Sequence, residues 1–282
     1  GALSLAVILL TLAAMASALS GIGRGIRWLS NINMALSWLL LIIFLVFGAS
    51  GFAVQLFYEG MHEYLTKLPE MSTTIWNDNR TPINQALSDW QSAWTIFYWA
   101  WWIAFAPFVG LFLARVSKGR SIREYVIGAI IAPSIMCFAW LCIVGGTALD
   151  LELSGVAKGA ILEADLSAQL FATVDHLFAK PWGMQMAVLC VLLLITYLVT
   201  SADSAVLVIN TIVSGGSPEG VHSRHIVLWS IILALVIITL LLAGGMDALR
   251  SVMIIGALPF SAVMLFMLFA LVRALWEDRR AK

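Results

Sequence analysis

Nine aromatic side chains lie between Trp94 and Phe112, and no residue in this stretch is acidic. The faces of indole and phenyl rings carry negative quadrupole charge and attract cations that lack a fixed hydration shell. A quaternary ammonium group has no N–H to donate, so aromatic rings hold it better than carboxylates do. The stretch therefore predicts a site for a quaternary ammonium compound. The missing acid favours a zwitterion such as a betaine over a metal ion.

The aromatic residues have the spacing of a helix. Five of them share one face by steps of three, four and seven residues, with Trp102 beside it: Trp94, Trp101, Phe105, Phe108 and Phe112. Pro107 lacks a backbone donor and Gly110 follows it, so we expect a kink or an unwound stretch in mid-membrane, where secondary transporters bind substrates and ions. Two other interpretations stay open: an interfacial aromatic belt, which fits Trp90 and Trp94, and packing or lipid contact without a ligand.

A polar group interrupts the apolar run 183–213. It consists of Thr200, Ser201, Asp203 and Ser204. Hydroxyl and carbonyl oxygens suit a hard cation such as sodium, and a carboxylate at this depth must face a protein interior or a cavity. Alternatively, the hydroxyls only bond back to helix carbonyls or to neighbouring helices. The acid within the cluster favours an ion site.

Composition places the chain in lipid. Of 282 residues, 61% are hydrophobic and 11% are charged, and the mean hydropathy is +0.96; soluble domains carry about 25% charged residues. The formal net charge is zero, which argues against a nucleic-acid partner. Cys137, Cys142 and Cys190 lie in apolar segments and indicate neither disulfides nor zinc. We expect no cofactor and no metal other than sodium.

Seven apolar runs are long enough to cross a bilayer as helices. They are 2–19, 33–57, 92–114, 125–147, 183–213, 226–244 and 251–273. The fold class is therefore an all-α polytopic membrane protein with about seven transmembrane helices. The chain opens at Gly1 inside an apolar run without the charged region of a signal peptide, so we expect a polypeptide cut within or just before a membrane helix.

Basic residues are distributed unequally between the loops. Eleven of the sixteen Lys and Arg residues lie in 20–32, 115–124, 214–225 and the tail from residue 273 onward, which the positive-inside rule assigns to the cytoplasm. The C-terminus is then cytoplasmic. The segments 58–91 and 148–182 lie outside, and each contains a stretch with the pattern of an amphipathic surface helix, although ordinary loops remain possible.

The strings WTIFYWAWWIAFAPFVGLFLARVSKGRSIREY, GIGRGIRWLSNINM and TSADSA closely resemble segments of the betaine/choline/carnitine transporter family. The resemblance covers essentially the whole chain. It implies the inverted-repeat fold of the amino-acid/sodium symporters, with twelve spans, of which this chain corresponds to about spans six to twelve. Residues 1–91 would hold the end of the first repeat and an outer amphipathic helix, 92–273 the complete second five-helix repeat, and 274–282 a cytoplasmic tail.

The resemblance also implies site residues. Trp102 resembles the main cation–π residue of the family's central site, lined by Trp99, Trp101 and Phe105. A second set resembles the family's sodium ligands: Phe108 for one ion, and Tyr197, Thr200 and Ser201 for another, with Asn33 behind them. Antiporters of the family that work without sodium tend to carry a basic residue at the Asn33 position, so the neutral Asn33 favours sodium coupling. The family often reads WWISWSPF where this chain reads WWIAFAPF, and Phe105 is a weaker cation–π partner than tryptophan.

Arg115 and Arg120 follow the aromatic helix on the cytoplasmic side. They are either positive-inside anchors or members of a gate ion pair, with Asp203 or Glu124 as partner. The rest of the aromatic cage would come from helices upstream of Gly1, so we expect that this chain alone does not transport.

The function expected from these observations is secondary active import of a betaine, choline or carnitine-type solute for osmoprotection. Sodium symport by alternating access is expected, with proton-coupled transport or ion-independent antiport as alternatives. The resemblance implies a homotrimer in the bacterial cytoplasmic (inner) membrane, in contact with the lipid bilayer. A redox or quinone-binding subunit is less compatible, because all four histidines lie in loops. A receptor or osmosensor on a transporter scaffold is a further possibility. No motif indicates an enzyme.

Overall fold

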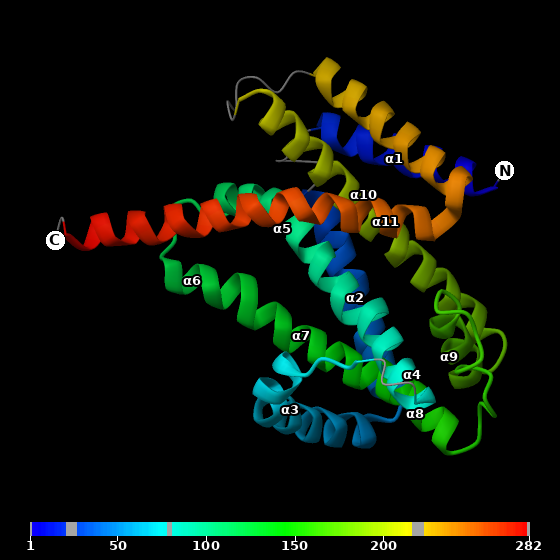
Figure 1. Ribbon diagram of the computed structural model, residues 1–282. Coiled ribbons are helices and arrows are strands. Elements are labelled where there is room, and N and C mark those ends of the chain that lie inside the picture. The colour runs from blue at the N-terminus through cyan, green and yellow to red at the C-terminus, as the bar shows by residue number, and fades with distance from the viewer. Residues whose placement is uncertain (1, 21–26, 78–80, 216–222, 281–282) are drawn as a thin grey trace. The chain divides into compact units, whose positions relative to one another are not determined.

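The computed structural model describes residues 2–20, 27–77, 81–215 and 223–280, without the side chains of residues 2, 115 and 116 (Figure 1). Within these ranges the chain is helical apart from connecting turns, which confirms the all-α prediction. The α-helices are α1 (Ala2–Ser20), α2 (Arg27–Phe47), α3 (Ser50–Thr73), α4 (Pro82–Gln91), α5 (Phe97–Val116), α6 (Ile122–Val126), α7 (Ala132–Trp140), α8 (Gly146–Leu153), α9 (Gln169–Leu177), α10 (Trp182–Val213) and α11 (Ser223–Arg280). Three π-helical turns, η2 (Ser92–Ile96), η3 (Ile127–Ile131) and η4 (Leu141–Gly145), join neighbouring helices without interruption.

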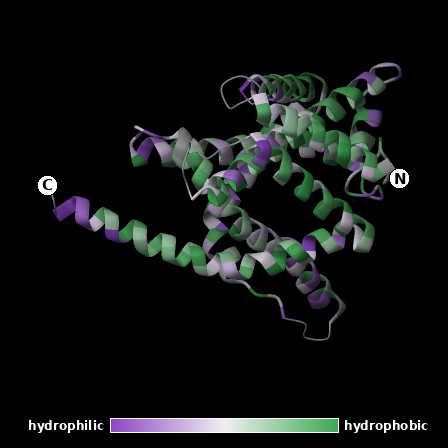
Figure 2. Ribbon diagram, turned by 90° about the horizontal axis from the view of Figure 1, so that it is seen from above, coloured by the Kyte–Doolittle hydropathy of each residue, from purple (hydrophilic) through white to green (hydrophobic). Residues whose placement is uncertain are grey.

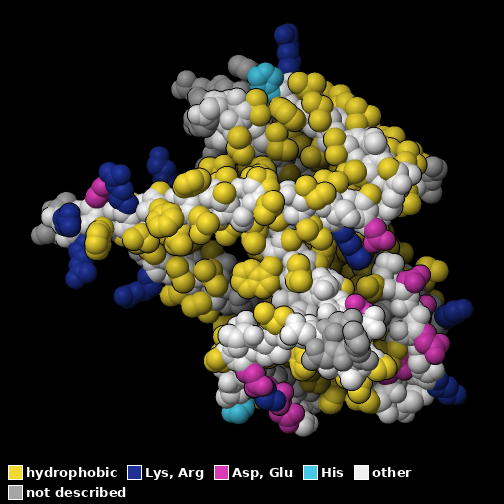
Figure 3. Space-filling view, viewed as in Figure 1, with side chains coloured by type: hydrophobic (Ala, Val, Ile, Leu, Met, Phe, Trp, Pro, Cys, Tyr) yellow, Lys and Arg dark blue, Asp and Glu magenta, His cyan; other side chains and the backbone are white. Residues whose placement is uncertain are grey.

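Six helical segments of the described residues are long and apolar enough to cross a membrane. They are Leu3–Ser20, Arg27–Phe47, Pro82–Ala114, Ile122–Leu153, Trp182–Val213 and Ser223–Arg280. Many of their large hydrophobic side chains are exposed, as expected for helices whose solvent is lipid. Hydrophobic residues dominate the long helices in Figure 2, and hydrophobic side chains spread over much of the face seen in Figure 3.

The last of the six segments consists of two helices. Gly244 and Gly245 have non-helical backbone angles, and Gly245 adopts φ 62°, ψ −144°, a conformation open only to glycine at low cost. The break separates a helix that begins at Ser223 from one that continues to Arg280. The two helices correspond to the predicted spans 226–244 and 251–273, so the seven predicted spans all have a helical counterpart.

Two details of the predicted spans are wrong. The expected span 33–57 ends early, because α2 stops at Phe47 and residues 50–57 already belong to α3. The stretch expected to unwind at Pro107–Gly110 is helical, and α5 continues through Pro107. A proline removes a single backbone N–H, and in lipid the remaining helical hydrogen bonds are too costly to open without other partners.

The described chain divides into two compact units. The first unit contains residues 1–19, 74–118 and 202–282, and the second contains 20–73 and 119–201. The boundary passes through α10, whose beginning belongs to the second unit and whose end belongs to the first. Each unit is described by itself below.

The second unit has a well-packed core. Leu40 and Phe44 of α2 contact Val174 of α9 and Cys190 of α10, and all four side chains are at most 1% exposed. The ring of Phe47 meets Phe178 edge to face, with 5.6 Å between ring centroids. The beginning of α10 is therefore held against α2, and this contact positions its polar residues.

The first unit is organised by α5, which packs along the second half of α11. The rings of Phe108 and Phe260 lie 5.4 Å apart, and the guanidinium of Arg250 lies 5.5 Å from the centre of the Phe97 ring. The terminal methyl group of Met267 lies beside Gly110, 3.9 Å from the position of a β-carbon, which is an ordinary van der Waals distance. One face of the aromatic helix is thus fixed by packing.

We predict that Gly48→Ala destabilises the second unit. A β-carbon at Gly48 would overlap the carbonyl oxygen of Phe44 and the hydroxyl of Thr147, which also donates to Ile143 O at 2.7 Å. Overpacking of this kind costs about 1–3 kcal/mol. The thermal unfolding midpoint of the purified protein should fall by several degrees. Gly51→Ala is the matched control, because nothing lies within 4 Å of its β-carbon position; equal midpoints for the two variants would contradict the packing described.

Candidate functional site

The aromatic helix has two unlike faces. The face toward α11 carries Ala100, which is 8% exposed, and the buried Pro107. At 100° per residue, Trp102 and Phe105 lie on the opposite side of the helix, with Trp101 at its edge. These three side chains are 63%, 45% and 43% exposed, in that order. Three of the four predicted substrate-binding residues therefore share the face of α5 that points away from its partner helix.

At the N-terminal end of this face, neighbouring aromatic rings pack against one another. Trp94 stacks on Tyr98 with a centroid distance of 5.9 Å and an angle of 9°. Trp101 lies 5.7 Å from Tyr98 and 6.2 Å from Phe97. Trp94 lies within the π-helical turn η2, which leads directly into α5; such turns occur often at functional sites. Ring contacts of this kind restrain Trp101 and leave its outer surface available.

Trp99, the fourth predicted substrate residue, has a different environment. It lies at a groove of about 450 Å³ between α5 and α11. The groove is lined by Ile96, Trp99, Ala100, Ile103, Ile254, Ala257, Leu258 and Ser261. Its one hydroxyl, on Ser261, donates to Leu258 O at 2.6 Å, so the groove is apolar. Within the first unit, Trp99 lines this groove, and Trp101, Trp102 and Phe105 are not among its lining residues.

Phe108 also lies toward α11, where its ring meets Phe260. The five aromatic residues expected on one face therefore do not share one environment. Phe105 and Trp101 are exposed, whereas Phe108 is packed against a neighbour. A sodium contact by Phe108 stays a prediction, and its backbone carbonyl or the face of its ring would have to supply it.

The polar residues of α10 lie near Asn33 of α2. The hydroxyl of Thr196 donates to Asn33 Oδ1 at 3.0 Å, and the hydroxyl of Thr200 donates to Tyr197 O at 3.0 Å. Thr196 and Thr200 are one helical turn apart, so Asn33 lies within about a turn of the predicted sodium ligands. Tyr197 is 61% exposed and Ser201 is exposed as well. The second unit thus brings together Asn33, Tyr197, Thr200 and Ser201 along α2 and α10.

Hydroxyl oxygens in this arrangement fit a sodium ion. The Thr200 hydroxyl donates its proton to Tyr197 O, and hydroxyl oxygens are ligands that a hard cation accepts. The back-bonding interpretation from the sequence is confirmed for Thr200, and sodium binding by this hydroxyl stays a prediction. Helix α10 is continuous through these polar residues, from Trp182 to Val213.

Each residue considered for a gate ion pair has its own surroundings in the structure. Asp203 is fully buried and accepts hydrogen bonds from Ser17 at 2.6 Å and from Ser204 at 3.2 Å. Glu124 forms a capping box with Ser121 at the start of α6. The side chain of Arg115 lies outside the described residues, and Arg120 belongs to the second unit. A gate ion pair stays a prediction.

The candidate residues are divided between the two units. The first unit holds the predicted substrate residues with Phe108 and Asp203, and the second holds Asn33, Tyr197, Thr200, Ser201 and Arg120. Each half is geometrically consistent on its own.

Sequence reasoning missed two contacts that organise these halves. The Thr196–Asn33 and Ser17–Asp203 hydrogen bonds join residues 163 and 186 positions apart. Thr196 could have been found from its place one turn before Thr200 on the same helix. Ser17 carries no comparable signal, because a lone serine in an apolar run usually bonds to its own helix.

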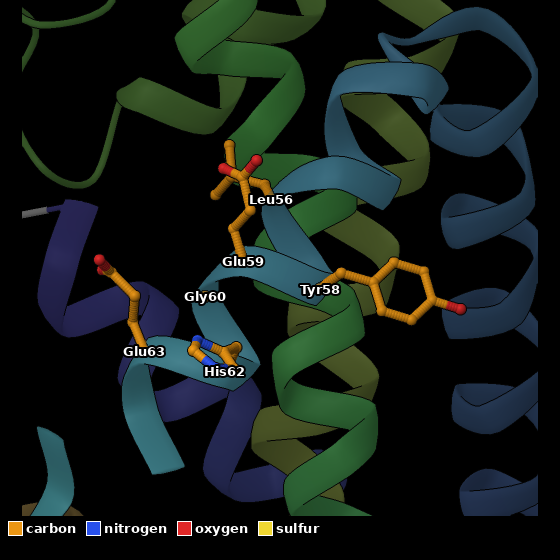
Figure 4. Close-up of a pocket in the computed structure, with 6 residues that line it drawn as sticks. All are labelled: Leu56, Tyr58, Glu59, Gly60, His62 and Glu63. Atoms are coloured by element: carbon orange, nitrogen blue, oxygen red, sulfur yellow. The ribbon is translucent and has the colours of Figure 1, made fainter. Parts of the chain in front are cut away.

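A second hollow lies along α3 and is not a ligand site of the same kind. Its six lining residues are Leu56, Tyr58, Glu59, Gly60, His62 and Glu63. Figure 4 shows the side chains of Tyr58, Glu59 and Glu63 pointing in different directions from the helix. Glu59 accepts a hydrogen bond from Gln55 at 2.8 Å, and Glu63 pairs with Lys67 at 3.1 Å. The carboxylates are thus engaged along their own helix and converge on no common point.

Comparison with known proteins relates the chain to characterised transporters. It is 40% identical over 276 residues to the glycine betaine transporter OpuD of Bacillus subtilis, covering 97% of this chain and 51% of that protein. It is 37% identical over 266 residues to an ectoine/hydroxyectoine transporter of Virgibacillus pantothenticus, covering 94% and 51%. It is 34% identical over 275 residues to the osmo-independent choline transporter BetT1 of Acinetobacter baylyi, covering 96% and 51%. The chain spans about half the length of these relatives.

A family model agrees with these relatives. The model of the betaine/carnitine/choline family transporters matches residues 2–280, nearly the whole chain. The match includes both the aromatic face of α5 and the polar residues of α10. The chain therefore belongs to the betaine/carnitine/choline transporter family.

Proposed function

We propose that the chain is part of a secondary active transporter that imports a zwitterionic onium solute of the glycine betaine type as an osmoprotectant. The observation that carries the proposal is the exposed aromatic face of α5, with Trp101, Trp102 and Phe105 on a helix without an acidic residue. Such a face attracts an onium headgroup through cation–π contacts and presents no carboxylate that would repel the carboxylate of a betaine.

The relatives support this class of substrate. Two of those described above are named for glycine betaine or choline, and one for ectoine and hydroxyectoine. The family consists of transporters and not enzymes, and its fold is that of the amino-acid/sodium symporters. Phe105, with its weaker π face than tryptophan, favours a site in which Trp102 carries most of the interaction with the cation.

Sodium is the coupling ion that the polar residues favour. The hydroxyls of Thr200 and Ser201, with Tyr197 and Asn33 beside them, supply neutral oxygens suited to a hard monovalent cation. A neutral Asn33 leaves the positive charge to the ion. Proton-coupled transport and ion-independent antiport are the alternatives within the family, and sodium replacement separates them from symport.

The arrangement in the membrane follows from the same proposal. Residues 92–273 form a complete second repeat and residues 1–91 the end of the first, and alternating access moves one repeat against the other around the aromatic site. The basic loops and tail place the C-terminus in the cytoplasm of a bacterium. A homotrimer is the proposed assembly, by analogy with the family.

An uptake panel tests the proposal. The full-length protein in liposomes should accumulate radiolabelled glycine betaine when sodium is present outside, and much less in potassium buffer. Choline, carnitine and ectoine in the same assay rank the substrates. Absence of saturable uptake for every one of these solutes, from protein that is correctly folded, would overturn the proposal.

A further inference from the structure

Arg250 of α11 lies at one end of a line of aromatic side chains on α5. Its guanidinium carbon is 5.5 Å from the centre of the Phe97 ring, and that ring is 6.2 Å from Trp101. Phe105 follows Trp101 by one turn, so Phe97, Trp101 and Phe105 lie along one side of the helix. Trp101 and Phe105 are exposed, and all four residues belong to the first unit. The line leads from Arg250 to the proposed substrate residues.

The charge of Arg250 is only loosely engaged by the protein. Among the described residues, its guanidinium donates no hydrogen bond and forms one ion pair, with Asp247 at 3.7 Å. Charge-assisted hydrogen bonds are about 2.7–2.9 Å long, so this contact is not one of them. The two side chains are 52% and 90% exposed, and ion pairs this exposed contribute little to stability. The N–H donors of Arg250 are therefore available to another partner.

No second basic side chain accompanies Arg250 along these two helices. Between its first turn and Arg273, α11 contains no basic residue other than Arg250, and α5 contains no charged residue before Arg115. At about 1.5 Å per residue, Arg273 is about 35 Å from Arg250 along α11, and Arg115 is about 27 Å from Phe97 along α5. The aromatic line therefore has one fixed positive charge at its beginning, and neither helix places another within it.

A zwitterionic onium solute carries both groups that such an arrangement binds. The planar guanidinium offers paired N–H donors that match the two oxygens of a carboxylate, and aromatic faces attract an onium group. In glycine betaine a single methylene group joins the two, so a carboxylate held by Arg250 keeps the onium group close to the rings that follow Phe97. Choline has the same trimethylammonium group without a carboxylate, and the guanidinium repels it.

We propose that Arg250 selects zwitterionic over purely cationic onium solutes by binding their carboxylate at the beginning of this aromatic line. Phe97 holds the guanidinium in place by stacking against it. Trp101, the next ring, offers an exposed surface to the onium group. Asp247 limits the selection, because its carboxylate competes with that of the solute for Arg250 and attracts a cation.

The inference rests on the proposed function and adds the residue that distinguishes the charge of the solute. In the proposed membrane arrangement, the connection between the two halves of α11 lies outside, so an imported solute would meet Arg250 before it meets the rings deeper in α5. The carboxylate contact is made in the first unit alone, and it does not involve the sodium ligands predicted on α2 and α10.

Competition between glycine betaine and choline measures the selection. In the full-length protein in liposomes, Arg250→Gln should raise the half-saturation constant of glycine betaine at least about tenfold, because hydrogen bonds between charged groups are lost. The inhibition constant of choline should stay unchanged or fall, because a repelling charge is removed. Arg250→Lys keeps the charge without the paired donors and should lie between the native protein and Arg250→Gln. Arg273→Gln is the matched control and should change neither constant, since Arg273 lies on the same helix and pairs with Glu277 at 2.7 Å.

Removing the competing carboxylate should have the opposite effect. In Asp247→Asn, the half-saturation constant of glycine betaine should fall about two- to threefold, and the inhibition constant of choline should rise by a similar factor. Asp247 is 90% exposed, and substitutions at such positions have little effect on stability. This variant therefore tests the proposal even if Arg250→Gln does not fold.

Calorimetric binding of the two solutes to the purified protein repeats the comparison without transport. Equal weakening of both solutes in Arg250→Gln would assign Arg250 to the fold or to the membrane interface and would overturn the proposal. Unchanged constants for both solutes in this variant would overturn it as well, as would shifts of the same sign for both in Asp247→Asn. A native protein that binds neither solute would contradict the proposed function and this selection together, whereas one that binds them without the predicted shifts contradicts the selection alone.

Discussion

Replacing Trp102 by alanine should abolish saturable uptake of glycine betaine by the full-length protein. Trp102 is the most exposed of the three residues on the free face of α5, at 63%. A desolvated cation–π contact contributes about 2 kcal/mol or more, with tryptophan the best of the aromatic partners. Its loss corresponds to a weakening of binding by at least about 30-fold.

The effect should depend on the π face and not on the volume of the side chain alone. Trp102→Phe keeps an aromatic ring with a weaker quadrupole, so its half-saturation constant should lie between those of the native protein and Trp102→Ala. Trp28→Ala provides the matched control, because Trp28 is 68% exposed on α2 and belongs to no predicted site. Binding measured by calorimetry would show whether the loss lies in affinity.

Full activity of Trp102→Ala would show that Trp102 is not the central residue of the substrate site. In that event the groove that contains Trp99 becomes the better candidate, since it is the other aromatic surface of α5 and is lined by residues of two helices. Trp99→Ala in the same assay distinguishes the two surfaces. Loss of uptake in Trp99→Ala alone would move the cation from the free face to the side facing α11.

Much of the fold could be predicted because lipid imposes a simple rule. A helix that crosses the bilayer needs about 20 apolar residues. For this reason, each predicted span has a helical counterpart in the structure. The break at Gly244–Gly245 was also predictable, since two apolar runs flank a polar stretch that contains Asp247 and Arg250. The expected span 33–57 failed because hydropathy cannot distinguish one long helix from two that meet at Gly48.

The site could be predicted in its chemistry and less well in its geometry. The aromatic stretch was specific enough to find the family, and the onium site itself stays a prediction. Its spacing could not tell which face of α5 packs against α11. That choice separates Phe108 and Trp99 from Trp102 and Phe105, and it depends on contacts such as Phe108–Phe260 between residues far apart in the sequence. The Asn33–Thr196 bond has the same origin.

Removing the Thr200 hydroxyl should weaken the binding of the sodium ion that drives transport. In Thr200→Ala, the external sodium concentration for half-maximal uptake should rise at least about tenfold, because an interaction with a charged partner is worth about 1.5–3 kcal/mol. The hydroxyl of Thr200 donates its proton to Tyr197 O, and a hydroxyl oxygen is also a ligand for a hard cation. Ser201→Ala should act in the same direction.

Thr211→Ala is the matched control for this change. Thr211 lies on the same helix and donates to Leu207 O at 2.9 Å, much as Thr200 donates to Tyr197 O at 3.0 Å. Each substitution therefore removes a threonine hydroxyl that donates to a carbonyl of the same helix. An effect of this lost hydrogen bond on helix stability would appear in both variants. A shift in the sodium requirement confined to Thr200→Ala identifies the ion site.

Substitution of Asn33 gives the most direct test of sodium coupling. Its side-chain oxygen is held by Thr196, one turn from Thr200, so a long basic side chain at this position would reach the same oxygens as the ion. Asn33→Arg should then permit exchange of substrate across the liposome membrane in the absence of sodium, while accumulation driven by a sodium gradient is lost. Sodium-driven accumulation that survives both Thr200→Ala and Asn33→Arg would mean that the coupling ion binds elsewhere, and that α2 and α10 only pack together at this point.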